Sequence, residues 1–138
     1  MAKGKELKKL PISGASHLHV KATLPDYNEV KPIFSLHCMD YRKDTCLSQC
    51  GNVSKASFAN TLLLLSQRTW KELLTTQKQS LGEESIPVER FKVPLPKIVT
   101  PEVRKLMVFR FSKSERMAGI RINDVYHVLV VGADLYNH

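Results

Sequence analysis

The chain has 138 residues, which suits one compact domain with a buried core and leaves little room for a second. Hydrophobic residues make up 43% of it and charged residues 25%, a balance that excludes a disordered, collagen-like or disulfide-dense chain. The net charge of +8 favours polyanionic partners such as nucleic acids. We therefore expect a single basic domain over residues 1–138, in which residues 1–30 form a weakly ordered arm.

Apolar runs in the sequence are short, and none approaches the roughly 18 to 20 residues of a membrane span. The basic N-terminus is not followed by the apolar segment of a secretory signal. Three cysteines, Cys38, Cys46 and Cys50, cannot all pair within one chain, which suits reduced thiols. These features predict a cytoplasmic protein with no membrane partner.

The first half of the chain predicts one strand and one long helix. Residues 31–39 alternate as in a strand, with Phe34, Leu36 and Cys38 facing the core. A polar loop follows, and a helix is then expected from about residue 55 to residue 79, with Ser54 as its N-cap. Its buried stripe repeats at intervals of three or four residues and comprises Phe58, Leu62, Leu65, Thr69 and Leu73.

The second half predicts a sheet. Prolines between residues 86 and 101 exclude a helix there and leave residues 88–93 as an extended or edge segment. Three strands then form an antiparallel meander, and they are expected over residues 106–111, 116–122 and 125–131. The last strand is apolar on both faces, so another layer packs on each side of it. The expected fold class is therefore α+β, with an antiparallel sheet packed against the long helix.

The positive charge is concentrated in one segment. Residues 11–89 are electrically balanced, whereas residues 90–121 contain nine basic residues and two acidic ones, a surplus of seven. In one interpretation this is a solvated face that keeps the protein soluble. In the other it is a binding surface, because the charge coincides with the first strands of the meander.

The C-terminal part of the chain, residues 90–138, resembles the RelE/ParE superfamily of bacterial toxins. The resemblance rests on a basic strand pair with Arg110 and Arg121, an apolar strand, and a polar C-terminal segment with Tyr136 and His138. It implies helices ahead of an antiparallel sheet. It also implies cleavage of mRNA on the ribosome without a metal or other cofactor, or action on DNA gyrase, and a cognate antitoxin protein as partner.

The same resemblance implies roles for individual residues. Basic residues on the sheet bind RNA phosphates in such toxins, and arginine suits this because its guanidinium group donates two hydrogen bonds at once. A histidine can remove the proton from the 2′-OH and protonate the leaving 5′-oxygen near neutral pH. The expected catalytic residues are His138, Tyr136, Arg121 and His127, and the expected RNA-binding residues are Arg110, Lys113, Arg116, Lys105 and Arg104.

Zinc ligand types also occur in the sequence. Cys46 and Cys50 are four residues apart, and His37 and Cys38 lie upstream, with two further histidines at positions 17 and 19. Structural zinc sites usually have two tight ligand pairs, and this chain has one. We therefore expect no metal and no other cofactor, and reduced thiols in a loop.

Other interpretations stay open for single residues and for the whole chain. His127 alternates with Leu129 and Val131, which fits a hydrogen-bonded histidine within a sheet as well as a catalyst. The arginines fit solvent-facing strand positions. The alternative to an enzyme is a non-catalytic nucleic-acid-binding or regulatory protein of phage or plasmid origin, and a third class binds only other proteins.

Overall fold

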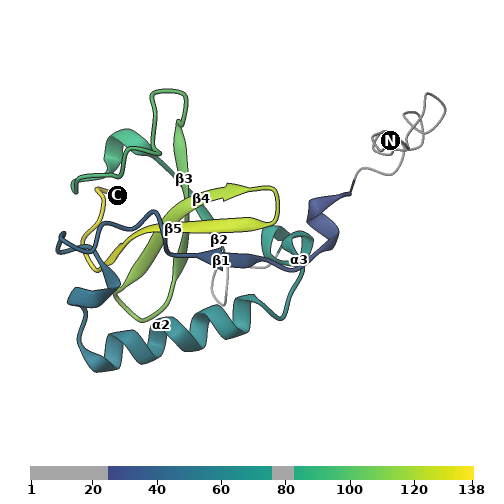
Figure 1. Ribbon diagram of the computed structural model, residues 1–138, viewed down its shortest axis with the longest axis horizontal. Coiled ribbons are helices and arrows are strands. Elements are labelled where there is room, and N and C mark those ends of the chain that lie inside the picture. Colours follow the sequence, from purple (N-terminus) through teal and green to yellow (C-terminus); the bar gives the residue numbers. More distant parts are fainter. Residues whose placement is uncertain (1–24, 76–82) are drawn as a thin grey trace, which may run out of the picture.

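The computed structural model describes residues 25–75 and 83–138, which form an α+β fold with a five-stranded mixed sheet. The strand order is β1-β5-β4-β3-β2, and α2 lies along one face of the sheet (Figure 1). The strands are β1 (Ile33–Ser35), β2 (Glu83–Pro87), β3 (Lys105–Arg110), β4 (Arg116–Ile122) and β5 (Val125–Gly132). The helices are α2 (Asn52–Leu65) and α3 (Trp70–Thr75), with single 3₁₀ turns at Tyr27–Glu29, Leu47–Gln49 and Val88–Arg90.

The predicted meander is confirmed, and the wholly antiparallel sheet is wrong. β3, β4 and β5 pair antiparallel close to the expected bounds, and β2 adds to the outer edge of β3. β1, however, pairs parallel to β5, with Phe34 opposite Tyr126. It is also shorter than expected, because the chain turns after Ser35 and leaves Leu36 exposed instead of in the core. Local alternation predicts a strand but does not determine which strand it pairs with.

The single long helix from residue 55 to residue 79 is also wrong, because it is two helices. α2 begins three residues earlier, with Gly51 as its N-cap, and ends at Leu65. α3 starts anew after Thr69, whose hydroxyl accepts a hydrogen bond from the backbone of Glu72 while the Glu72 carboxylate accepts one from the backbone of Thr69. This reciprocal capping box starts a helix and so separates the two. Residues 76–79 lie outside the described part.

Two hydrophobic cores lie on opposite faces of the sheet. The first core packs α2 and α3 against the sheet through side chains that include Phe58, Leu65, Trp70, Phe109 and Tyr126. The second core lies under the irregular segment that follows β2, and it includes Leu106, Val108, Leu135 and Tyr136. This confirms that β5 is covered on both faces.

A β-bulge in β5 changes which residues share a face. Gly119 of β4 pairs with Val128, and its neighbour Ala118 pairs with Val130, so Leu129 is an extra residue. Leu129 and Val130 both belong to the second core, and Val131 returns to the first. Strict alternation wrongly predicts that Leu129 and Val131 share a face, because a bulge shifts the period by one residue.

The segment expected to be extended over residues 88–93 begins as a 3₁₀ turn and then holds the C-terminal segment in place. Phe91 forms a bridge with Tyr136, the backbone of Lys92 donates to Leu135, and the backbone of Asn137 donates to Arg90. The ammonium group of Lys92 lies 2.7 Å from the Asp134 carboxylate. Residues 134–138 are therefore docked on the second core rather than frayed.

Residues 25–30 of the expected N-terminal arm pack against α3, because the backbone of Trp70 donates to Val30 and Lys71 lies 3.8 Å from Glu29. Residues 1–24, with the alternating stretch around His17, lie outside the described residues. Within residues 25–75 and 83–138, no helix is both long enough and apolar enough to cross a membrane.

Candidate functional site

Four of the predicted site residues lie together where the β3–β4 hairpin meets the docked C-terminal segment: Arg110, Arg116, Tyr136 and His138, here called the Arg–Tyr site. Arg110 and Arg116 are directly opposite each other across the two strands. They lie on the sheet face of the second core, because Arg110 follows Leu106 and Val108 at intervals of two. Tyr136, on the segment after β5, belongs to the same core.

The Tyr136 hydroxyl is the unusual group of the site. The residue is 4% exposed, and its hydroxyl is the only buried side-chain nitrogen or oxygen in the described residues that has no hydrogen-bond partner. Burial, with a smaller contribution from the Glu84 carboxylate, raises the pKa of this phenol. The positive charges of Arg116 and Arg110 oppose part of the rise, and Arg116 also approaches the phenol oxygen as a hydrogen-bond donor. Arginine cannot accept a hydrogen bond, so the phenol proton still has no acceptor in the described residues. The phenol is therefore neutral at physiological pH and has a hydrogen bond to offer. An unsatisfied buried donor costs about 1–3 kcal/mol, so a partner from outside the chain is favoured there.

His138 and Phe91 both contact the Tyr136 ring. The ring centroids of Tyr136 and His138 are 5.1 Å apart, and those of Tyr136 and Phe91 are 5.2 Å apart. His138 is exposed, so its imidazole is accessible to solvent beside the Tyr136 ring. The site therefore combines two guanidinium groups, a neutral phenol and an accessible imidazole.

The hairpin turn that carries the two arginines is held to α2 by Glu115. The hydroxyl of Ser54 lies 2.8 and 2.9 Å from the two carboxylate oxygens of Glu115, and Ser112 donates to the same carboxylate at 3.0 Å. Ser54, expected from the sequence to cap the helix, therefore donates a hydrogen bond to Glu115 in the β3–β4 turn instead. This contact crosses from the helix layer to the strand end and positions Arg116, the next residue along the chain.

Arg121 does not join the Arg–Tyr site, which corrects one predicted catalytic residue. It lies on the opposite face of the sheet, where its guanidinium carbon is 4.3 Å from the centroid of the Trp70 ring. Its nitrogens donate to the carbonyl of Asn123 and to the side chain of Asn28, both at 2.7 Å. Residues five apart on a regular strand face opposite sides, so the spacing from Arg116 already carries this information.

The remaining basic residues divide between the two ends of the hairpin. Lys113 is exposed in the β3–β4 turn, next to the site. Lys105 and Arg104 lie at the far end of β3, where Lys105 pairs with Pro87. Arg104 there lines an open hollow of about 390 Å³ together with Val88 and Val99. Lys105 and Arg104 therefore lie at the opposite end of β3 from Arg110 and are not part of the Arg–Tyr site.

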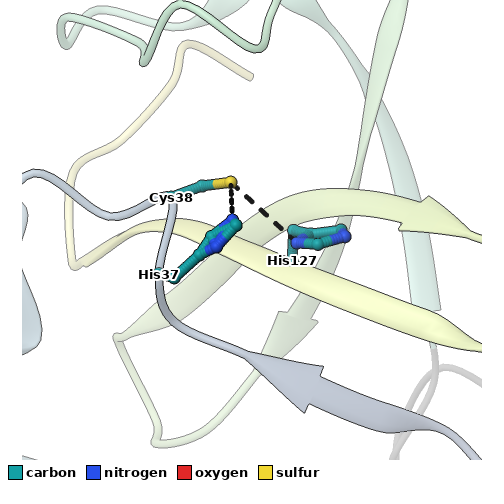
Figure 2. A group of neighbouring side chains, drawn as sticks. All are labelled: His37, Cys38 and His127. Atoms are coloured by element: carbon teal, nitrogen blue, oxygen red, sulfur yellow. Dashed lines mark hydrogen bonds between the residues drawn. The ribbon is translucent and has the colours of Figure 1, made fainter.

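His127 lies in a second group, with His37 and Cys38 (Figure 2). The Cys38 Sγ is 3.4 Å from Nε2 of His37 and 3.9 Å from Nδ1 of His127. Figure 2 shows His37 and Cys38 on the loop after β1, with the sulfur turned toward the imidazole of His127 on β5. His127 therefore contacts a cysteine and a second histidine and is not one of the residues that face Tyr136.

The other zinc ligand types of the sequence are not part of this group. Cys46 is buried and accepts hydrogen bonds from the backbone and hydroxyl of Ser48. Cys50 packs against the first core, and burial, with the nearby Glu115 carboxylate, raises the pKa of its thiol. The histidines at positions 17 and 19 lie outside the described residues. The proximity of His127 to Cys38 depends on the parallel pairing of β1 with β5, for which the sequence contains no local signal.

No protein-family model matches this chain, and neither a curated protein nor a solved structure matches it.

Proposed function

We propose that this protein is a toxin-like endoribonuclease of the RelE/ParE kind, which holds an RNA phosphate with Arg110 and Arg116 and cleaves beside it. The observation that carries the proposal is the buried Tyr136 hydroxyl, whose proton has no acceptor within the described residues, next to two guanidinium groups. Two neighbouring cations and a neutral donor close to both suit a phosphate, whose oxygens can accept hydrogen bonds from all three. The two helices ahead of the meander agree with the arrangement that the family resemblance implies.

The proposed reaction uses the 2′-OH of the RNA as nucleophile. The imidazole of His138 removes its proton, the 2′-oxygen forms a bond to phosphorus, and the bond from phosphorus to the 5′-oxygen breaks. The imidazolium then returns the proton to the 5′-oxygen. The products are a 2′,3′-cyclic phosphate and a 5′-hydroxyl. Arg110 and Arg116 stabilise the charge on the phosphorane, and the Tyr136 hydroxyl donates to one of its oxygens.

A cognate antitoxin completes the proposal, with the protein acting on mRNA in the cytoplasm, on the ribosome. Support for a protein partner comes from α2, where Leu63 and Leu64 are 60% and 52% exposed and Val53 is 82% exposed. Large exposed apolar side chains on one helix suit a protein contact. This surface lies on the helix layer, away from the face that carries Tyr136.

The first test is expression of the chain alone in a bacterial host, followed by mapping of the RNA ends. Growth arrest with new 5′-hydroxyl ends is the expected result. His138→Ala lowers the cleavage rate of the purified protein by about 10²–10⁴-fold, the usual contribution of an acid–base group. Tyr136→Phe also slows cleavage while the fold is kept, since the proton of the hydroxyl has no acceptor within the described residues.

A matched pair of variants tests the binding surface. Arg116→Ala weakens RNA binding by about ten- to a hundredfold, because it removes charge-assisted hydrogen bonds. It also reduces the slope of log affinity against log salt by about 0.7. Lys105→Ala removes an equal charge at the far end of the neighbouring strand and is the control. Equal effects of both variants would contradict a site at Arg110 and Arg116.

The same experiments distinguish the alternative of a non-catalytic nucleic-acid-binding or regulatory protein. In that case RNA binding falls steeply with salt and depends on Arg116, but no product forms and His138→Ala has no effect. Absence of RNA binding at low salt would exclude both functions.

A further inference from the structure

We propose that His37, Cys38 and His127 bind a divalent transition-metal ion of the zinc type, at a site separate from the Arg–Tyr site. Within the described residues, this is the one group of three or more His, Cys, Asp or Glu side chains whose ligand atoms converge, all within 4.8 Å of one another. The proposal does not rest on RNA cleavage.

The distances suit tetrahedral coordination. With Zn–S near 2.3 Å and Zn–N near 2.05 Å, a tetrahedral ion separates a sulfur from a nitrogen ligand by about 3.6 Å. The two sulfur-to-nitrogen distances here are 3.4 and 3.9 Å, on either side of this value. The two nitrogens must approach to about 3.3 Å in the bound state. The exposed His37, which lies after the end of β1, can make this adjustment by side-chain rotation.

The backbone fixes the other two ligands relative to each other. Ser35 is the register partner of His127 in the parallel pair, so the chain leaves β1 directly beside this histidine. Behind His127, Gly119 packs so closely that a Cβ there would overlap the His127 carbonyl oxygen. Cys38 and His127 are half-buried against the second core, while His37 is exposed. The site is therefore preformed on its inner side, and its outer side, where His37 lies, is exposed. Figure 2 shows how the three side chains approach one another.

The donor set indicates the kind of ion. One thiolate and two neutral imidazoles favour Zn²⁺ or its substitute Co²⁺ over the hard ions Mg²⁺ and Ca²⁺, which prefer oxygen ligands. Three protein ligands leave the fourth position of a tetrahedron for a water molecule or an outside ligand. Because this position faces solvent next to the exposed His37, the coordination is that of an open site rather than a closed structural one.

The test is titration with Co²⁺ of the full chain, reduced and free of any polyhistidine tag. One equivalent is expected to produce visible d–d bands and a thiolate-to-cobalt charge-transfer band in the near ultraviolet. Cys38→Ser removes the charge-transfer band. Cys50→Ser, which changes the other half-buried cysteine, keeps it. Survival of the band in Cys38→Ser, or its loss only in Cys50→Ser, would overturn the proposal.

Two histidine variants test the site separately from any effect on folding. His37→Ala changes an exposed side chain and is expected to leave the circular dichroism spectrum and the melting temperature of the metal-free protein unchanged. It weakens Zn²⁺ binding, measured by competition with a chelating dye, by at least about a hundredfold, because even outer-sphere partners of a ligand contribute 10–100-fold. His127→Ala is expected to weaken Zn²⁺ binding by a similar factor. Unchanged Zn²⁺ affinity in either variant, or no stoichiometric binding by the parent chain, would refute the site.

Discussion

Each face of the sheet buries one tyrosine, and the two hydroxyl groups have different surroundings. Under the helices, Tyr126 is completely buried and donates a hydrogen bond of 2.6 Å to the carbonyl of Met107. Under the irregular segment after β2, Tyr136 is almost as buried, yet the proton of its hydroxyl has no acceptor in the described residues.

The comparison of the two tyrosine hydroxyls indicates which face of the sheet is suited to bind a ligand. On the helix-covered face, the polar groups that point inward already have partners, as Tyr126 and Arg121 do. On the other face, as far as the structure describes the chain, the proton of the Tyr136 hydroxyl has no acceptor, and the His37, Cys38 and His127 side chains converge. A buried polar group costs free energy until it is satisfied, so a ligand binds where the protein has left such groups unsatisfied. We therefore expect the interior of the helical face to contribute stability, and we place both proposed ligand sites on the other face.

The largest loss of stability is expected from Gly119→Ala. Gly119 lies in β4, where the strand packs closely against the backbone of β5. The new Cβ would overlap the His127 carbonyl oxygen and contact the Tyr126 ring, so β4 and β5 must separate. We expect a loss of about 3 kcal/mol in the free energy of unfolding, measured by urea denaturation. Gly51→Ala, where a Cβ meets no atom within 4 Å, is the control and costs less than about 1 kcal/mol.

The next effect concerns the contact that ties the helix layer to the arginine hairpin. Glu115→Ala leaves the hydroxyls of Ser54 and Ser112 without their shared acceptor. The expected loss is about 2 kcal/mol, since hydrogen bonds to charged groups contribute about 1.5–3 kcal/mol. RNA affinity falls as well, because the turn no longer positions Arg116. Unchanged RNA binding in a folded Glu115→Ala protein would show that the hairpin holds its shape without α2.

Tyr126→Phe tests the satisfied tyrosine. At neutral pH, loss of the hydrogen bond to Met107 lowers the free energy of unfolding by about 1–2 kcal/mol. Burial raises the pKa of Tyr126 well above its ordinary value, so above about pH 10 the unfolded phenol releases a proton that the folded one keeps. The stability of the parent protein therefore falls as the pH rises beyond this point. Denaturation curves from pH 8 to pH 11 should show a weaker decline in Tyr126→Phe.

The smallest effect on stability is expected from Tyr136→Phe, the matched change on the other face. Because the proton of the Tyr136 hydroxyl has no acceptor in the described residues, removal of this hydroxyl leaves the free energy of unfolding within about 0.5 kcal/mol or raises it. A loss as large as that of Tyr126→Phe would mean that the two hydroxyls are equally satisfied, and the difference between the faces would disappear.

The strands of this fold could be predicted from sequence because alternation is a local property. The bounds of β4 match the expected ones, β3 begins and ends one residue earlier than expected, and β5 is one residue longer. The bulge at Leu129, the parallel partner of β1 and the break before Trp70 could not be read in the same way. Each depends on tertiary packing or on a cap that a continuous apolar stripe conceals.

The two candidate sites also differ in how far the sequence predicts them. Arg110, Arg116, Tyr136 and His138 could be identified because the family resemblance points to them, and the structure brings them together. Arg121 was included wrongly, although its odd spacing from Arg116 places it on the other face. The group around Cys38 could not be predicted. Cys38 and His127 are 89 residues apart in the sequence and meet through the β1–β5 pair.

The contacts between residues 134–138 and residues 90–92 determine how these two segments can detach from the sheet. The amide protons of Lys92 and Asn137 take part in hydrogen bonds that join these two segments, with the Phe91–Tyr136 bridge between them. Neither segment can leave without breaking the contacts of the other. The two therefore form one cooperative unit in hydrogen exchange, with a shared opening free energy below that of the sheet. We therefore expect Tyr136 and His138 to become ordered, or to be released, together in a single step.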